Sequence, residues 1–125
     1  MVPEESGGFL YASGMTYEIR TDIPSGCKKD GNGLFTGVEG EYRVRNVMIG
    51  VEPLALGRVY TLATQDFTLL NHGDGQTAFD GAKTVWQADV SDYGVVAAYL
   101  LEDLNGIVGD AYANPYGQGR IVAVD

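Results

Sequence analysis

Eighteen glycines interrupt this sequence at irregular intervals and limit the length of any regular element. Glycine adopts backbone conformations that other residues avoid, so it marks turns and the ends of helices and strands. Because the spacing shows no repeat, the pattern predicts short strands joined by many turns rather than a repeat architecture. The length of 125 residues predicts one domain, residues 1–125.

Several glycine-bounded segments have the composition of strands. Met15, Tyr17 and Ile19 alternate with polar residues, a period typical of a half-exposed strand. The segment RVYTLATQDF is rich in β-branched and aromatic residues and predicts a central strand. The predicted strands are residues 9–12, 15–20, 42–49, 58–67 and 121–124, and the predicted loops or turns are 21–38, 50–54, 71–75 and 115–119.

One helix is clearly predicted, over residues 91–104. Ser91 can cap the amide of residue 93 or 94. Val96, Leu100 and Leu104 then recur on one face, and Asn105–Gly106 is a typical helix end. Strands followed by a late helix predict an α+β fold.

Composition excludes several classes of function. Seventeen acidic and eight basic residues give a formal net charge of −9, which argues against nucleic-acid binding. No apolar run is long enough to span a bilayer, so no transmembrane segment is expected. One cysteine, Cys27, cannot form an internal disulfide. A single histidine, His72, with scattered carboxylates cannot supply a two-metal site, so no metal site is expected in this chain.

Five short motifs, in order, resemble the C-terminal domain of the 5'-nucleotidase / UDP-sugar hydrolase family. They are GFLYASG at 8–14, VEPL at 51–54, YTLAT at 60–64, DF at 66–67 with GDG at 73–75 and Phe79, and GRI at 119–121. The resemblance implies that residues 1–125 form a partial domain of this type, with a mixed sheet and truncated at its N-terminal side.

The resemblance also implies a division of labour. In this family an N-terminal metallophosphoesterase domain holds two divalent metal ions, and the C-terminal domain binds the base and ribose of a nucleotide. The chain is therefore expected to recognise nucleotides but to contain no catalytic residue, and to be inactive when isolated. The parent protein is expected to be a metal-dependent 5'-nucleotidase that converts a nucleoside monophosphate to nucleoside and phosphate. Its expected location is extracellular, periplasmic or at the cell surface.

Two residues are the expected substrate contacts. The counterpart of Phe67 in the family stacks on the base, and that of Asp74 accepts hydrogen bonds from the ribose hydroxyls. Aromatic stacking tolerates every base, and a carboxylate between two glycines can approach a sugar closely. The loop departs from the family pattern in three ways: Asp74 lies one residue farther from Phe67, His72 replaces a glycine, and Gln76 replaces an aromatic residue.

Two other functions remain open. Sugar-nucleotide and 2',3'-cyclic nucleotide hydrolases share this C-terminal domain. A non-catalytic surface interaction module is the alternative from another class, and His72, Gln76 and the segment 21–38 favour it.

Overall fold

The computed structural model describes residues 11–114 and 116–125. The chain forms two compact units, one of Met1–Phe79 with Gly119–Asp125 and one of Asp80–Gln118. Of the predicted strand at 9–12, residues 9 and 10 lie outside the described residues, and Tyr11 and Ala12 belong to no strand. Pro115, in the predicted turn at 115–119, also lies outside them.

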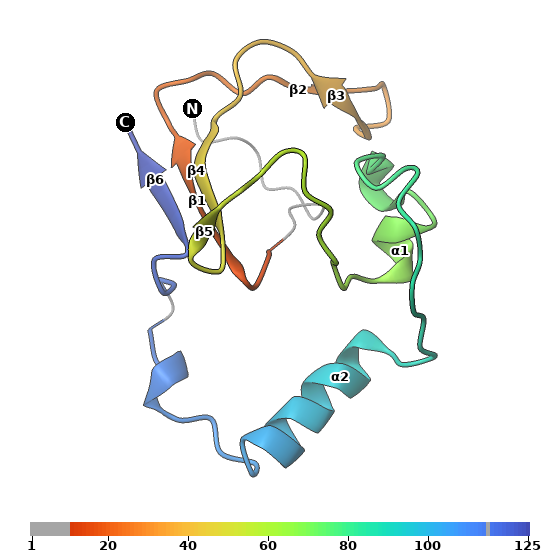
Figure 1. The fold of residues 1–125 in the computed structure, drawn as a ribbon, viewed down its shortest axis with the longest axis vertical. Coiled ribbons are helices and arrows are strands. Elements are labelled where there is room, and N and C mark those ends of the chain that lie inside the picture. The colour runs from red at the N-terminus through yellow and green to blue at the C-terminus, as the bar shows by residue number, and fades with distance from the viewer. Residues whose placement is uncertain (1–10, 115) are drawn as a thin grey trace. The chain divides into compact units, whose positions relative to one another are not determined.

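The first unit contains a four-stranded mixed sheet (Figure 1). Its strands, in spatial order, are β5 (Glu52–Pro53), β4 (Val44–Ile49), β1 (Met15–Arg20) and β6 (Ile121–Val124). β6 runs parallel to β1, and the other neighbours are antiparallel. The predicted strands at 15–20 and 121–124 and the α+β class are therefore confirmed, and the strand predicted at 42–49 is present from Val44. The prediction of a turn over 50–54 is wrong in part, because β5 lies within it.

A bulge interrupts the pairing of β1 with β4. Thr16 pairs with Met48, but Glu18 pairs with Arg45, so β4 has one extra residue between these pairs. Asn46 adopts a left-handed φ of 51° there, and its side-chain amide donates to the Glu18 carboxylate at 2.6 Å. Asparagine is among the few non-glycine residues that tolerate this conformation, which explains why the bulge falls at Asn46.

The prediction of a loop over 21–38 is wrong, because the segment contains an antiparallel hairpin. Its strands are β2 (Cys27–Lys29) and β3 (Phe35–Val38). The polar residues between them form the turn, in which the Asp30 carboxylate accepts from the amides of Asn32 and Leu34 at 2.8 and 2.9 Å. The glycines and polar residues thus mark a turn within this segment rather than its whole length.

The predicted strand at 58–67 is also wrong. Residues 58–65 have no regular structure, and α1 (Asp66–Leu69) follows. The contacts of this stretch are local: the Tyr60 hydroxyl accepts from the Ala55 amide at 3.0 Å, and the Arg58 guanidinium lies 5.3 Å from the Tyr60 ring centre. A high β-propensity reflects the fit of a side chain to a half-buried sheet, and among the residues that the structure describes no strand pairs with this segment.

The second unit contains the predicted helix. α2 (Asp92–Ala98) continues as a π-helical segment, η2 (Tyr99–Asp103). As predicted, the Ser91 hydroxyl accepts from the Gly94 amide, at 3.3 Å. The Gly106 amide, at a φ of 73°, donates to the Leu100 carbonyl at 2.7 Å and ends the helix, as Asn105–Gly106 predicted.

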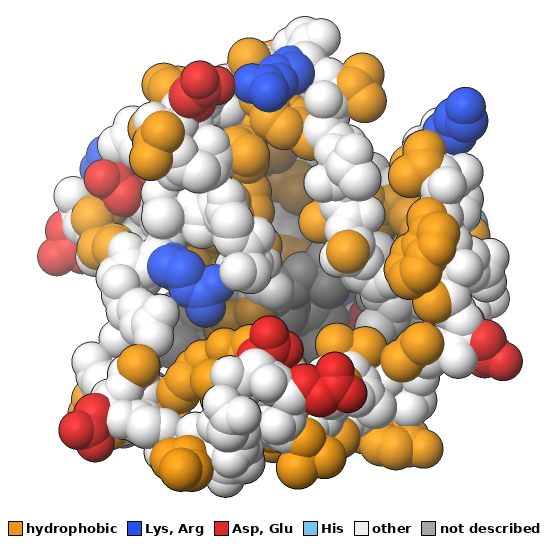
Figure 2. Space-filling model, turned by 60° about the horizontal axis from the view of Figure 1, so that its bottom comes forward, with side chains coloured by type: hydrophobic (Ala, Val, Ile, Leu, Met, Phe, Trp, Pro, Cys, Tyr) orange, Lys and Arg blue, Asp and Glu red, His pale blue; other side chains and the backbone are white. Residues whose placement is uncertain are grey.

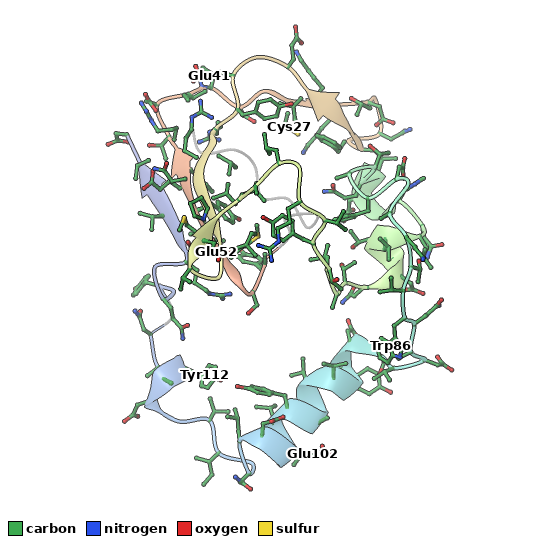
Figure 3. All side chains as sticks on the ribbon, in the orientation of Figure 1. Cys27, Glu41, Glu52, Trp86, Glu102 and Tyr112 are labelled. Atoms are coloured by element: carbon green, nitrogen blue, oxygen red, sulfur yellow. The ribbon has the colours of Figure 1, made fainter. Side chains whose placement is uncertain are left out.

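A short 3-10 helix, η3 (Asp110–Tyr112), is linked to η2 by one side-chain contact. The hydroxyls of Tyr99 and Tyr112, the latter labelled in Figure 3, form a hydrogen bond of 2.6 Å. The hydrogen bond to Tyr112 raises the pKa of the Tyr99 hydroxyl above its ordinary value. This contact joins the two helical segments within the second unit.

Apolar side chains are exposed in both units. Among residues 11–114 and 116–125, no hydrophobic side chain is buried, and Thr68 is the most buried non-glycine residue, 8% exposed. Every residue of β1 is half-buried, so its alternation does not separate a buried face from an exposed one. Hydrophobic side chains accordingly appear over the visible face in Figure 2. Within the described part of the chain, no helix is long and apolar enough to cross a membrane.

Candidate functional site

Phe67 lies in α1, a single helical turn. Gln65, with extended backbone angles, precedes the helix, and the Leu70 amide donates to the Asp66 carbonyl at 2.8 Å. Thr68 faces inward, whereas Phe67 is 53% exposed. The sequence placed Phe67 at the end of a strand, but the helix gives it the accessible position that a stacking residue requires.

Asp74 lies in the tight turn η1 (Gly73–Gly75). His72, Asp74 and Gly75 have left-handed φ angles of 50°, 55° and 77°. The Gly75 amide donates to the His72 carbonyl at 2.8 Å, and the Gln76 amide donates to the Gly73 carbonyl at 3.1 Å. Aspartate and histidine tolerate this conformation better than most residues, which fits their places here. The turn leaves Asp74 exposed.

Gly73 directly precedes Asp74 in the sequence and contacts the ring of Phe67. A Cβ atom built on Gly73 would overlap three consecutive carbons of the Phe67 ring, Cδ1, Cε1 and Cζ, at nearly equal distances. A point beside the ring edge would lie much closer to one carbon than to its two neighbours, so Gly73 lies against the ring face. Gly73 is buried by this contact, and the next residue is Asp74. The structure therefore sets the residue before Asp74 against the Phe67 ring.

Both side chains that the resemblance implies as nucleoside contacts are exposed. An exposed aromatic ring can stack on any base, because every base has a π-face. An exposed carboxylate can accept hydrogen bonds from two hydroxyls, and such charge-assisted bonds are roughly twice as strong as neutral ones. The assignment of these two side chains as substrate contacts stays a prediction, and sequence reasoning did not foresee Gly73, whose missing Cβ admits the ring. The two glycines that flank Asp74 were the sequence feature that could have predicted a close backbone approach at Gly73.

The described residues do not fit the two metal ions that the resemblance implies for the parent enzyme. Within 11–114 and 116–125, no three side chains of His, Cys, Asp or Glu gather closely enough to hold a metal ion. A two-metal site needs more such ligands than that.

A concave region with a volume of about 470 Å³ lies on the sheet of the first unit. It is lined by Thr16, Tyr17, Glu18, Asn46, Val47, Met48, Pro53, Gly119, Arg120 and Val122. Burial raises the pKa of the Tyr17 hydroxyl, as does the neighbouring Tyr11. The region contains neither Phe67 nor Asp74, and sequence reasoning missed it because strands far apart in the chain form it.

The Gly73 contact leads to a prediction. We expect Gly73→Ala to displace the Phe67 ring and to weaken nucleotide binding by about tenfold, within the range for losing one stacked base. Gly73 has no left-handed φ, so alanine introduces the collision without backbone strain. AMP titrations monitored by NMR would measure the effect. Gly57→Ala is the control, because Gly57 also lacks a left-handed φ and has nothing within 4 Å of its Cβ position; equal affinities for the two variants would contradict the contact.

Comparison with known proteins gives one match. A family model described as 5'-nucleotidase, C-terminal domain, matches residues 3–81. The matched range includes Phe67 and the whole of η1 and ends before α2. No curated protein and no solved structure matches the chain.

Proposed function

Because this chain belongs to the 5'-nucleotidase C-terminal domain family, we propose that it is the nucleotide-recognition domain of a 5'-nucleotidase-type phosphohydrolase. The whole enzyme converts a nucleoside monophosphate to nucleoside and phosphate. The observation that supports the proposal is the contact of Gly73 with the Phe67 ring, because Gly73 directly precedes Asp74 and both Phe67 and Asp74 are exposed.

In this proposal the chain holds the nucleoside end of the substrate. Phe67 stacks on the base, and the Asp74 carboxylate accepts hydrogen bonds from the ribose hydroxyls. Neither residue touches the reacting phosphate. Binding energy from these remote groups is converted into orientation of the phosphate at the reacting centre.

The chemistry belongs to a metallophosphoesterase domain, the proposed partner of this chain. Two divalent metal ions bound there would activate the attacking water and stabilise charge on the phosphate. The exposed apolar side chains of the first unit, including Val51, Leu56 and Val59, supply the kind of surface that another domain covers. Such an enzyme would act outside the cytoplasm, in the periplasm or at the cell surface.

Two alternatives compete with this function. The same apolar surface also favours a non-catalytic interaction module that retains the fold without nucleotide affinity. A sugar-nucleotide or 2',3'-cyclic nucleotide hydrolase would use the same base contact. Comparing the affinities for AMP, UDP-glucose and 2',3'-cyclic AMP separates these functions, since an interaction module binds none of them.

The main test measures binding and hydrolysis on the same chain. We expect AMP to shift the NMR signals of Phe67 and of Gly73–Gly75, and ribose 5-phosphate, which lacks a base, to bind at least about fivefold more weakly. We expect no phosphate release from AMP with Mn²⁺ or Zn²⁺, because the assigned residues only bind. Turnover that a chelator abolishes, and that a mock purification lacks, would contradict the division of labour. Absence of AMP binding would contradict the recognition function.

A further inference from the structure

The hairpin formed by β2 and β3 lies against the turn that carries Asp74 (Figure 1). A Cβ atom built on Gly75 would lie 2.5 Å from the carbonyl oxygen of Phe35 and 2.9 Å from its amide nitrogen. Phe35 is the first residue of β3. The backbone of the hairpin therefore approaches η1 as closely as a glycine permits, one residue after Asp74.

We propose that the β2–β3 hairpin is a positioning element that fixes Asp74 for the ribose. This inference rests on the proposed function and deepens it by assigning sugar selectivity to a segment outside the α1–η1 site. Phe67 is positioned differently, by α1 and by Gly73. The hairpin contacts η1 at Gly75, next to Asp74 and two residues after Gly73, so a displaced hairpin should disturb the carboxylate more than base stacking.

The hairpin has the internal bonds that a positioning element needs. At its open end, the Glu39 amide donates to the Gly26 carbonyl at 2.8 Å, and the Lys28 ammonium lies 2.7 Å from the Glu39 carboxylate. At its closed end, Asp30 accepts two amides and the Asp30 amide donates to the Leu34 carbonyl at 2.9 Å. Both ends are closed, and the strands pair between them with a one-residue bulge at Thr36. We expect a shift at the Gly26 end to reach Phe35 through this pairing.

Gly26 offers a way to disturb the hairpin from a distance. A Cβ atom there would overlap the Glu39 carbonyl oxygen, a backbone atom that cannot rotate away. Gly31 is the matched control, because it lies in the same hairpin, also lacks a left-handed φ, and has nothing within 4 Å of its Cβ position. Gly26→Ala and Gly31→Ala therefore differ only in whether the hairpin must shift.

The experiment compares the affinities of both variants for AMP and for 2',3'-dideoxy-AMP, which lacks both ribose hydroxyls. We expect Gly26→Ala to weaken AMP binding by about tenfold, the size of one charge-assisted hydrogen bond. Dideoxy-AMP binding should stay within about twofold of wild type, and Gly31→Ala should leave both affinities unchanged. Equal losses for the two nucleotides would show general damage and overturn the proposal, as would two unchanged affinities.

Hydrogen exchange tests the hairpin contact without any nucleotide. The amides of Gly75 and Gln76 close η1, so their exchange should quicken in Gly26→Ala and not in Gly31→Ala. If wild type fails to prefer AMP over dideoxy-AMP, the ribose contact of the proposed function is wrong, and the exchange result still decides whether the hairpin holds the turn. Unchanged exchange would overturn that role.

A second pair of variants covers the case in which Gly26→Ala does not fold. Gly75→Ala places the collision at the other side of the contact, where the φ is 77°. Gly33→Ala carries the same backbone strain, at a φ of 83°, with nothing within 4 Å of the added atom. We expect only Gly75→Ala to lose the preference for AMP over dideoxy-AMP, and equal behaviour of the two variants would overturn the proposal.

Discussion

Phe67→Ala should weaken AMP binding by about five- to 150-fold. Base–aromatic stacking contributes about 1–3 kcal/mol per base, and each 1.4 kcal/mol corresponds to a factor of ten in affinity. The 53% exposure of Phe67 means that its removal leaves only a small cavity in the free protein. The loss should be similar for purine and pyrimidine nucleotides, because stacking is tolerant of base identity. Titrations with AMP, GMP, CMP and UMP measure it directly, and kcat/KM reports it in the hydrolase containing this chain.

Matched variants separate stacking from structural damage. Leu70→Ala removes a side chain of nearly equal exposure, 51%, just after the same helix, and should leave AMP affinity within about twofold. Phe67→Leu keeps an apolar side chain but removes the π-face, so it should behave like Phe67→Ala. Ribose 5-phosphate has no base and should bind both variants as it binds wild type. If its binding falls as far as that of AMP, Phe67 maintains the fold and does not stack.

Asp74→Asn should reduce the preference for ribose more than the affinity for the base. An ionised carboxylate can accept bonds from both hydroxyls, whereas an amide has one acceptor oxygen and makes a weaker, neutral bond. We expect AMP binding to weaken by about five- to 30-fold, which corresponds to about 1–2 kcal/mol. Binding of 2',3'-dideoxy-AMP should change little, because no hydroxyl is present to lose its acceptor. The affinities of wild type and Asp74→Asn for AMP and for dideoxy-AMP form a double-mutant-style cycle. Its coupling energy measures the contact between Asp74 and the ribose hydroxyls.

The charge of the ligand requires its own control for this substitution. AMP is an anion, so removing any acidic residue from a chain of net charge −9 favours its binding slightly. Asp89→Asn makes the same charge change at an exposed position in the second unit, outside the proposed site. The change in binding free energy that Asp89→Asn causes for each nucleotide is subtracted from the change caused by Asp74→Asn before the coupling energy is calculated. A coupling energy near zero would mean that Asp74 only shapes the turn.

The candidate site was partly predictable. The residue types of Phe67 and Asp74, together with the family resemblance, identified both side chains before any fold was known. Their geometry was not predictable, because Phe67 was expected on a strand and lies in a helical turn. The contact between its ring and Gly73 depends on the left-handed angles at His72 and Asp74, which pattern analysis does not specify.

The sequence by itself determined the elements whose causes are local. The helix at 92–103 follows from its cap at Ser91, its apolar period and its glycine end, all within one segment. The strands β1, β4 and β6 follow in the same way from short alternating or β-branched runs bounded by turn residues. The helix contacts join residues a few positions apart, and the strand runs are marked by their own composition, so the order of residues is sufficient to predict where these elements lie, although not which strands pair.

The tertiary structure decided which segments pair with another strand. β1 pairs with β6, about a hundred residues later, and strand pairing of this kind depends on chain closure rather than on local composition. Residues 58–65 have strand-forming side chains, but no strand within 11–114 and 116–125 pairs with them, whereas residues 27–38 look like a loop but pair as a hairpin. A strand satisfies its backbone hydrogen bonds only through a neighbour, which explains why these two segments reversed their predicted roles.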